Sequence, residues 1–109
     1  MANKVIVGVS GGPDSMYLLT KIYRKRLHTP VAVHVNYNFR EESVKEMELV
    51  KEFCKRNKIE FHILDVTKEV KEKYSHISNK QSMARRIRYD FYKQIANELG
   101  ITKVFLSDL

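Results

Sequence analysis

Six consecutive residues near the N-terminus combine groups that could bind an anion: Ser10, Gly11, Gly12, Pro13, Asp14 and Ser15. The two glycines have no side chains, so backbone N–H groups can approach a ligand closely. The two serines add hydroxyl donors. A helix that starts within this stretch would turn the positive end of its dipole toward the ligand, which favours phosphate groups. The alternative is a tight strand-to-helix turn in which Asp14 and Ser15 only cap the helix.

The flanking residues predict the elements that such a turn needs. Lys4 to Val9 is a β-branched run typical of a buried strand. Asp14 to about Arg26 has the apolar spacing of a helix, with Met16, Leu19, Ile22 and Tyr23 on one face. No lysine follows the glycines, so the stretch is not a Walker A loop, and it is not a GxGxxG turn.

The middle of the chain predicts a second strand, a second helix and a third strand. The strands are Val31 to Val35 and Phe61 to Leu64. The helix should start near Val44, because Ser43 and Glu46 have capping-box spacing. Its apolar stripe is Met47, Val50 and Cys54, flanked by Leu49 and Phe53, and Asn57 is its expected left-handed terminator. Residues 65–77 are ambiguous between a loop and a short helix.

The last third predicts a long helix and a fourth strand. Ser78 and Gln81 again have capping-box spacing, and Gly100 stands where a C-terminal glycine belongs. The inward positions are Ala84, Ile87, Phe91, Ile95 and Leu99. Lys103 to Leu106 is the fourth strand. Alternating strands and helices predict a doubly wound α/β fold with a parallel sheet, in which ligands bind beyond the carboxyl ends of the strands.

Size and charge narrow the class of protein. The 109 residues are 43% hydrophobic and 30% charged, which suits one globular domain. The net charge of +7 favours anionic partners such as RNA, although a basic surface without nucleic acid is equally compatible. No apolar run approaches the ~20 residues of a membrane span and no secretory leader is recognisable. A single cysteine excludes an internal disulfide. We therefore expect a cytoplasmic protein without a membrane partner.

Three stretches resemble one enzyme family. SGGPDS is similar to the SGGxDS pyrophosphate loop (PP-loop) of the ATP pyrophosphatases. Residues 32–43, AVHVNYNFREES, resemble the HVxHGLRxxS segment of the tRNA(Ile)-lysidine synthases, and residues 79–92, NKQSMARRIRYDFY, resemble their NxExxARxxRYxFF helix. The resemblance implies that residues 1–109 are the N-terminal part of a Rossmann-like PP-loop nucleotide-binding domain, truncated, with strand order 3-2-1-4.

The sequence also departs from that family. Tyr37 replaces the usual His, Asn38 the usual Gly, and Gln81 a common acidic residue. The family's later HHxxDDxxET stretch does not occur, so the chain is either a fragment or a reduced relative. We expect that the chain alone forms no lysidine. Because its fourth strand lies at a sheet edge, we also expect either marginal stability or self-association, including a homodimer.

The resemblance implies a reaction. Lysidine synthases use ATP to adenylate the cytidine at the first anticodon position of tRNA(Ile), releasing pyrophosphate. The amine of free lysine then displaces AMP at C2. Mg²⁺ would bridge the phosphate oxygens. The cofactors implied are ATP and Mg²⁺, and the partners are tRNA(Ile) and lysine.

The resemblance also assigns roles to residues of the loop and of the helix. Residues 10–15 would bind ATP, and Asp14 would be essential to catalysis, through the metal. Arg85 and Arg88 share a helix face and would lie at the active site, one of them touching the target nucleotide or ATP. The alternative for these two is a solvated basic face, and Arg86 is expected at the surface.

Further residues are expected near the nucleotide. Val35 and Asn36, at the end of the second strand, would meet the adenine, while the side chain of His34 is expected in the core. Arg40 would contact phosphate or pin its loop. The helix also carries three aromatic residues, which helical spacing places in the core rather than in base stacking: Tyr89, Phe91 and Tyr92.

Two other functions are compatible with the sequence. One is another enzyme of the same superfamily, such as a tRNA thiolase or an amidotransferase-type synthetase. Thiolases of this type usually need paired cysteines, and the synthetases lack the ARxxRY helix. The other is a nucleotide-binding module without catalysis.

Overall fold

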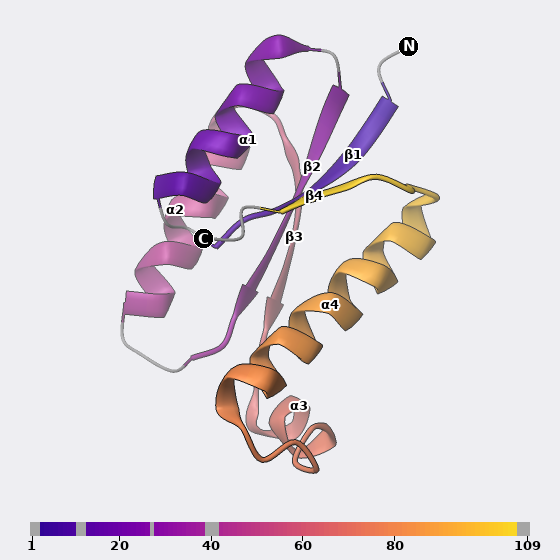
Figure 1. The fold of residues 1–109 in the computed structure, drawn as a ribbon. Helices are drawn as coiled ribbons and strands as arrows, with labels where there is room; N and C mark the ends of the chain where they lie inside the picture. The colour runs from indigo at the N-terminus through magenta and orange to yellow at the C-terminus, as the bar shows by residue number, and fades with distance from the viewer. Residues whose placement is uncertain (1–2, 11–12, 27, 39–41, 107–109) are drawn as a thin grey trace.

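The computed structural model describes residues 3–10, 13–26, 28–38 and 42–106 (Figure 1). The elements, in chain order, are β1 (Asn3–Gly8), α1 (Pro13–Lys25), β2 (His28–Asn36), α2 (Glu42–Arg56), β3 (Glu60–Asp65), α3 (Lys68–Lys73), α4 (Lys80–Leu99) and β4 (Val104–Leu106). The ambiguous residues 65–77 therefore hold a short helix.

The four strands form one parallel sheet in the order β3-β2-β1-β4, which confirms the predicted fold class and strand order. Val7 of β1 pairs with Ala32 of β2 on one side and with Phe105 of β4 on the other. Within the described residues β4 is an edge strand, and Val104 is 40% exposed there.

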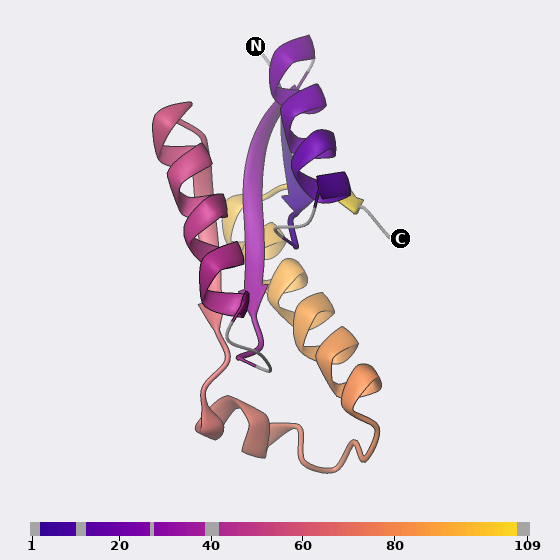
Figure 2. The same ribbon diagram turned by 90° about the vertical axis from the view of Figure 1, so that its left-hand side faces the viewer.

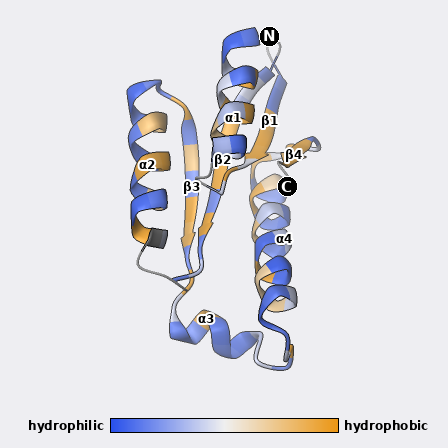
Figure 3. Ribbon diagram, turned by 60° about the vertical axis from the view of Figure 1, so that its left-hand side comes forward, coloured by the Kyte–Doolittle hydropathy of each residue, from blue (hydrophilic) through white to orange (hydrophobic). Residues whose placement is uncertain are grey.

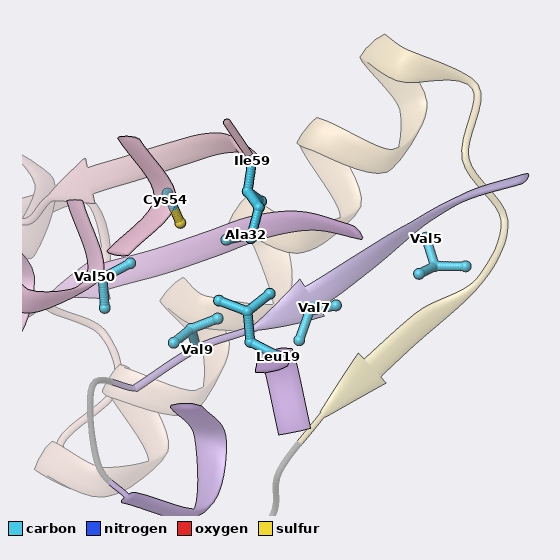
Figure 4. Packing of buried hydrophobic residues seen from close by; sticks show 8 residues of the cluster. All are labelled: Val5, Val7, Val9, Leu19, Ala32, Val50, Cys54 and Ile59. Carbon is cyan, nitrogen blue, oxygen red and sulfur yellow. The ribbon is translucent and has the colours of Figure 1, made fainter. Parts of the chain in front are cut away.

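Helices cover both faces of the sheet, with α1 and α2 on one side and α4 on the other (Figures 1 and 2). The alternation of side chains along β1 explains this arrangement. Val5, Val7 and Val9 pack against Leu19 of α1 in one cluster, which Figure 4 shows, whereas Ile6 packs on the α4 side. Figure 3 shows the apolar strands between helices whose outer faces are hydrophilic. A sheet that is covered on both faces explains why its strands are continuous apolar runs.

The long helix α4 runs from the carboxyl edge of the sheet toward its amino edge. Ile87 packs with Val35 and Val66, which lie at the end of β2 and just after β3, whereas Ile95 packs with Val31, near the start of β2. The first half of α4 therefore lies beside the edge where ligands bind in such folds.

Caps at three helix ends differ from the sequence prediction. Helix α2 begins at Glu42, so Ser43 lies inside its first turn and is not the N-cap. The N-cap of α4 is Asn79 rather than Ser78, because the Asn79 side chain accepts hydrogen bonds from two backbone N–H groups of the first turn. The left-handed residue after α2 is Lys58 (φ 55°) rather than Asn57.

The end of α2 shows why Asn57 is not left-handed. Its N–H still donates to the carbonyl of Phe53 in the helical pattern, at 3.1 Å, and its side-chain amide donates to the same oxygen. The N–H of Ile59 then reaches back to the carbonyl of Cys54, at 2.8 Å, as in a Schellman motif. That motif requires Lys58 to be left-handed. Gly100 (φ 67°) ends α4 as predicted.

Most of the predicted core is confirmed. Val50, Cys54, Ile87 and Ile95 are buried, and Phe91 packs against the core. Tyr89, however, is 43% exposed, so its prediction as a core residue is wrong. It lies between Arg88 and Asp90 on the outer side of α4, whereas Tyr92 is buried.

None of the helices in the described part of the chain has the length and apolar character that crossing a membrane requires.

Candidate functional site

The loop after β1 is closed by a serine pair. The Ser10 backbone N–H donates to the Ser15 hydroxyl oxygen at 3.1 Å, and the Ser10 hydroxyl bonds to the same oxygen at 3.1 Å. Ser15 is buried on α1, whereas Ser10 is exposed. Pro13 is the first helical residue, a position that suits its fixed φ. Ser10 therefore lies against the first turn of α1. Gly11 and Gly12 lie outside the described residues.

His34 fixes the start of this loop. Its Nδ1 lies 2.6 Å from the Val9 carbonyl oxygen, so Nδ1 carries the proton and donates. The Val9 N–H donates to Val33 at 2.9 Å, so the backbone at Val9 is tied to β2 through both of its polar groups. His34 is 3% exposed, and burial lowers its pKa although the bond to Val9 and the charge of Glu46 act in the opposite direction. His34 is therefore neutral at pH 7 and lies in the core, as predicted.

The lowered pKa of His34 predicts a loss of stability in mild acid. The unfolded chain binds a proton at the ordinary value of 6.5, whereas the folded protein does so only at lower pH. The free energy of unfolding should therefore fall as pH drops below 6.5 toward the folded pKa. The His34→Asn variant keeps an N–H near the Nδ1 position but cannot titrate. Urea unfolding of both proteins between pH 7 and pH 5 should show a shallower decline for the variant, and equal slopes would contradict the prediction.

A polar cluster joins the ends of β2 and β3. The Asn38 side-chain amide donates to Asp65 at 2.6 Å and to the carbonyl of Val66 at 3.0 Å. The Asn36 amide lies 3.1 Å from the Asn38 side-chain oxygen and 3.4 Å from Asp65. Asn38 is left-handed (φ 59°), a conformation that Asn tolerates better than most residues. The Asn at the family's usual Gly position therefore preserves the turn and also links two strand ends.

The two residues expected near adenine are both buried. Val35 is 7% exposed and packs with Val66 and Ile87 on the α4 side. Asn36 is 2% exposed, and its carbonyl accepts from the N–H of Val66 at 2.8 Å. Their contact with adenine stays a prediction. Arg40 lies outside the described residues.

The arginines of α4 have different surroundings. Arg86 is largely exposed and pairs with Asp90 at 3.4 Å, which confirms its surface position. Arg85 is also exposed. Arg88 is half-buried, its Nε is buried without a hydrogen-bond partner among the described residues, and its guanidinium carbon lies 5.7 Å from the Tyr89 ring centroid. Arg88 is therefore the most enclosed of the three cations.

Asp14 is exposed in the first turn of α1. A carboxylate oxygen is a ligand that Mg²⁺ prefers, and this ion is commonly held by one or two carboxylates together with substrate phosphates. In the described segments no three His, Cys, Asp or Glu side chains come together as a metal site. The role of Asp14 as a magnesium ligand stays a prediction.

The described site residues come from two parts of the fold. Ser10 precedes α1, Asp14 and Ser15 lie in its first turn, and Arg88 lies in the first half of α4, which covers the opposite face of the sheet. That they form one site stays a prediction. Sequence reasoning missed the contributions of Asp65 and Tyr37. Asp65 ends the third strand, and polar residues at that edge are a usable signal. The Tyr37 hydroxyl donates to the Ala84 carbonyl oxygen of α4 at 2.9 Å, a contact between residues far apart in the sequence that left no local signal.

A parallel sheet with a glycine- and serine-containing loop before α1 defines a class of nucleotide-binding α/β proteins. A model of the PP-loop domain family matches residues 1–108, and the chain belongs to that family. The chain is 42% identical over 104 residues to the tRNA(Ile)-lysidine synthase of Ureaplasma parvum. The matched region covers 95% of this chain and 30% of that protein. It is 41% identical over 107 residues to the tRNA(Ile)-lysidine synthase of Malacoplasma penetrans, covering 98% and 35%. The chain thus spans about a third of the length of these relatives.

Solved structures show the same fold. The U34-tRNA thiolase of Methanococcus maripaludis superposes with a TM-score of 0.71 at 23% identity, over 95% of this chain and 37% of that one. The NH3-dependent NAD synthetase of Campylobacter jejuni has a TM-score of 0.66 at 19% identity, over 87% and 42%. These likenesses concern the fold alone.

Proposed function

We propose that this chain supplies the ATP-binding part of a tRNA(Ile)-lysidine synthase. The observation that carries the proposal is the SGGPDS loop at the carboxyl edge of the parallel sheet, closed by the Ser10–Ser15 pair. The PP-loop family and the names of the relatives support it. The reaction proposed is adenylation of a cytidine of tRNA(Ile) by ATP, followed by attack of lysine at C2 with release of AMP.

In this proposal the loop binds the phosphates of ATP. The Ser15 hydroxyl accepts from the Ser10 N–H and lies within hydrogen-bond distance of the Ser10 hydroxyl, so Ser10 is already held against α1. Such preorganisation lowers the entropic cost of binding. The positive end of the α1 dipole favours the phosphate charge.

Asp14 would hold Mg²⁺, which neutralises phosphate charge when bound. Without a cation, the exposed carboxylate would repel a triphosphate at this helix terminus. The charge of Asp14 is therefore compatible with phosphate binding only if a metal ion lies between them.

Arg85 and Arg88 would act from the other side of the sheet edge. A guanidinium binds phosphate and base edges through two parallel N–H donors. Arg88 has one buried N–H group and is only partly exposed, which suits an arginine that faces a ligand with a restricted orientation. Arg85 is open to solvent and would contact the more distant part of the nucleic acid.

The lone cysteine does not favour the thiolase alternative. Cys54 is buried in the core among Val50 and Ile59, and burial raises the pKa of its thiol to about 11. A thiol with this pKa is protonated and weakly nucleophilic at pH 7.

A side chain that keeps the backbone N–H groups of the loop away from the phosphates should weaken ATP binding. The Gly12→Val substitution would place a branched side chain where a backbone N–H is expected to meet phosphate. We expect ATP affinity, measured by calorimetric titration with Mg²⁺, to fall by about 30-fold or more. Gly100→Ala is the matched control, because it changes a glycine at the far end of α4 and should leave ATP affinity unchanged. Equal ATP affinity for Gly12→Val and the unsubstituted chain would refute the phosphate-binding role of the loop.

A chimaera tests the whole reaction. Residues 1–109 would replace the matching segment of the Ureaplasma parvum relative, and lysine-dependent AMP release and lysidine would be measured on a tRNA(Ile) transcript. We expect lysidine from the chimaera and none from residues 1–109 alone. A folded chimaera that binds ATP but releases no AMP with tRNA(Ile) and lysine would favour a nucleotide-binding module instead.

A further inference from the structure

Tyr37 connects the end of β2 to the first half of α4. Its hydroxyl donates to the carbonyl oxygen of Ala84 at 2.9 Å, across a sequence separation of 47 residues. Its ring packs against the cluster that contains Val35 and Ile87. Tyr37 therefore contacts the same stretch of α4 that carries Arg88.

The bonded carbonyl is itself part of the Arg88 turn. In an α-helix the N–H of residue 88 pairs with the carbonyl of residue 84, so the Tyr37 hydroxyl contacts the turn that ends at Arg88. The side chains of Tyr37 and Arg88 also interact electrostatically. Burial raises the pKa of the Tyr37 phenol, while the Arg88 guanidinium acts in the opposite direction.

The Arg88 side chain combines a buried polar atom with an aromatic contact. Its Nε is buried without a hydrogen-bond partner among the described residues, and the Tyr89 ring lies 5.7 Å from its guanidinium carbon. The Tyr89 ring is therefore one contact that restricts the orientation of the guanidinium. A freely rotating arginine would lose considerable side-chain entropy on binding a ligand, and a packed one loses less.

We infer that Tyr37 is a positioning residue, which fixes the Arg88 guanidinium at the carboxyl edge of the sheet. The inference rests on the proposed function, in which Arg88 meets ATP or the target nucleotide. The resemblance to the lysidine synthases places a His at this position. The hydroxyl of Tyr37 gives this chain a link from β2 to the Arg88 turn that depends on the longer side chain.

The first test needs no ligand. In residues 1–109 labelled with ¹⁵N, the solvent exchange of the Arg88 Nε–H is measured by NMR in the parent chain and in Tyr37→Phe. The substitution keeps the ring and removes the hydroxyl, and we expect exchange to accelerate about tenfold. Tyr74→Phe is the matched control, because its hydroxyl donates to the Asp90 carboxylate on the same helix, at 2.7 Å. It should leave the Arg88 signal unchanged. No acceleration in Tyr37→Phe, or the same acceleration in both variants, overturns the inference.

The second test is a double-mutant cycle on binding. Affinities for MgATP and for an RNA hairpin with the anticodon loop of tRNA(Ile) are measured for the parent chain, Tyr37→Phe, Arg88→Ala and the double variant. We expect Tyr37→Phe to lower the affinity for one of these two ligands about fivefold. In the Arg88→Ala background the same substitution should leave that affinity unchanged. Equal losses in both backgrounds would show that Tyr37 acts on the fold and not through Arg88. If the parent chain binds neither ligand, the proposed function fails, whereas binding with additive losses overturns only the inference.

Discussion

The Asp14→Asn substitution is expected to lower AMP formation by the chimaera about 100-fold or more, with little change in stability. Asn has nearly the size of Asp and the same capping ability, but it carries no charge to hold Mg²⁺ beside the phosphates. Removing a group that stabilises transition-state charge typically costs a factor of this order. The measurements are AMP release at saturating ATP, the Mg²⁺ dependence of ATP affinity in residues 1–109, and the midpoint of thermal unfolding.

A surface carboxylate provides the control for Asp14. Glu52 lies on α2 and pairs with Arg56 at 2.6 Å, with both side chains largely exposed. Glu52→Gln removes the same charge away from the loop and should leave AMP release unchanged. Near-normal AMP release by Asp14→Asn at ordinary Mg²⁺ concentration would reduce Asp14 to a helix-capping residue.

The Gly8→Ala substitution should have the largest effect on stability. A Cβ at this position would lie 2.6 Å from the Leu106 side chain, 2.6 Å from the Tyr92 hydroxyl oxygen and 2.8 Å from the adjoining ring carbon. Leu106 can rotate away, but the buried Tyr92 ring is enclosed between α4 and the sheet. We expect a loss of about 2 kcal/mol in the free energy of unfolding, measured with urea.

A second substitution checks the cause of that loss. Tyr92→Phe removes the oxygen that an added Cβ would meet, so Gly8→Ala should cost about 1 kcal/mol less in that background. Gly100→Ala provides the comparison, since its Cβ would meet nothing within 4 Å and its cost comes only from the left-handed backbone. That cost should be the same with Tyr92 or Phe. Equal costs of Gly8→Ala in both backgrounds would argue against a clash with the Tyr92 hydroxyl oxygen.

Gly8 and Tyr92 also affect the candidate site. Gly8 is the last residue of β1 and precedes the loop, so a displaced Tyr92 would move the strand end that carries Ser10. The same close approach allows α4 to lie near the sheet, which brings the Arg88 turn to the carboxyl edge. The packing of Tyr92 of α4 against the sheet and the position of the end of β1 are therefore linked through Gly8.

The amino-acid sequence by itself predicted the four strands and the three longer helices, and it left the short helix α3 ambiguous. The runs at Val5–Val9 and Val31–Val35 are apolar and β-branched because both faces of the sheet are covered, so each strand is visible without its neighbours. The SGGPDS loop is a local pattern, since its strand, its turn and its helix are consecutive. With the resemblance, the alternation of elements led to the order β3-β2-β1-β4, because parallel strands need right-handed crossovers.

The tertiary structure alone decided which side chains meet at the carboxyl edge. The bonds from Tyr37 to Ala84 and from His34 to Val9 join residues that are distant in the chain, and neither has a periodic or local signature. Helix caps were also misassigned at Ser43 and Ser78, because neighbouring residues compete for the same N–H groups and only the backbone path selects one. Short-range patterns fix elements because they depend on local backbone and burial periodicity. Contacts between elements depend on how those elements pack, and only the folded chain defines that.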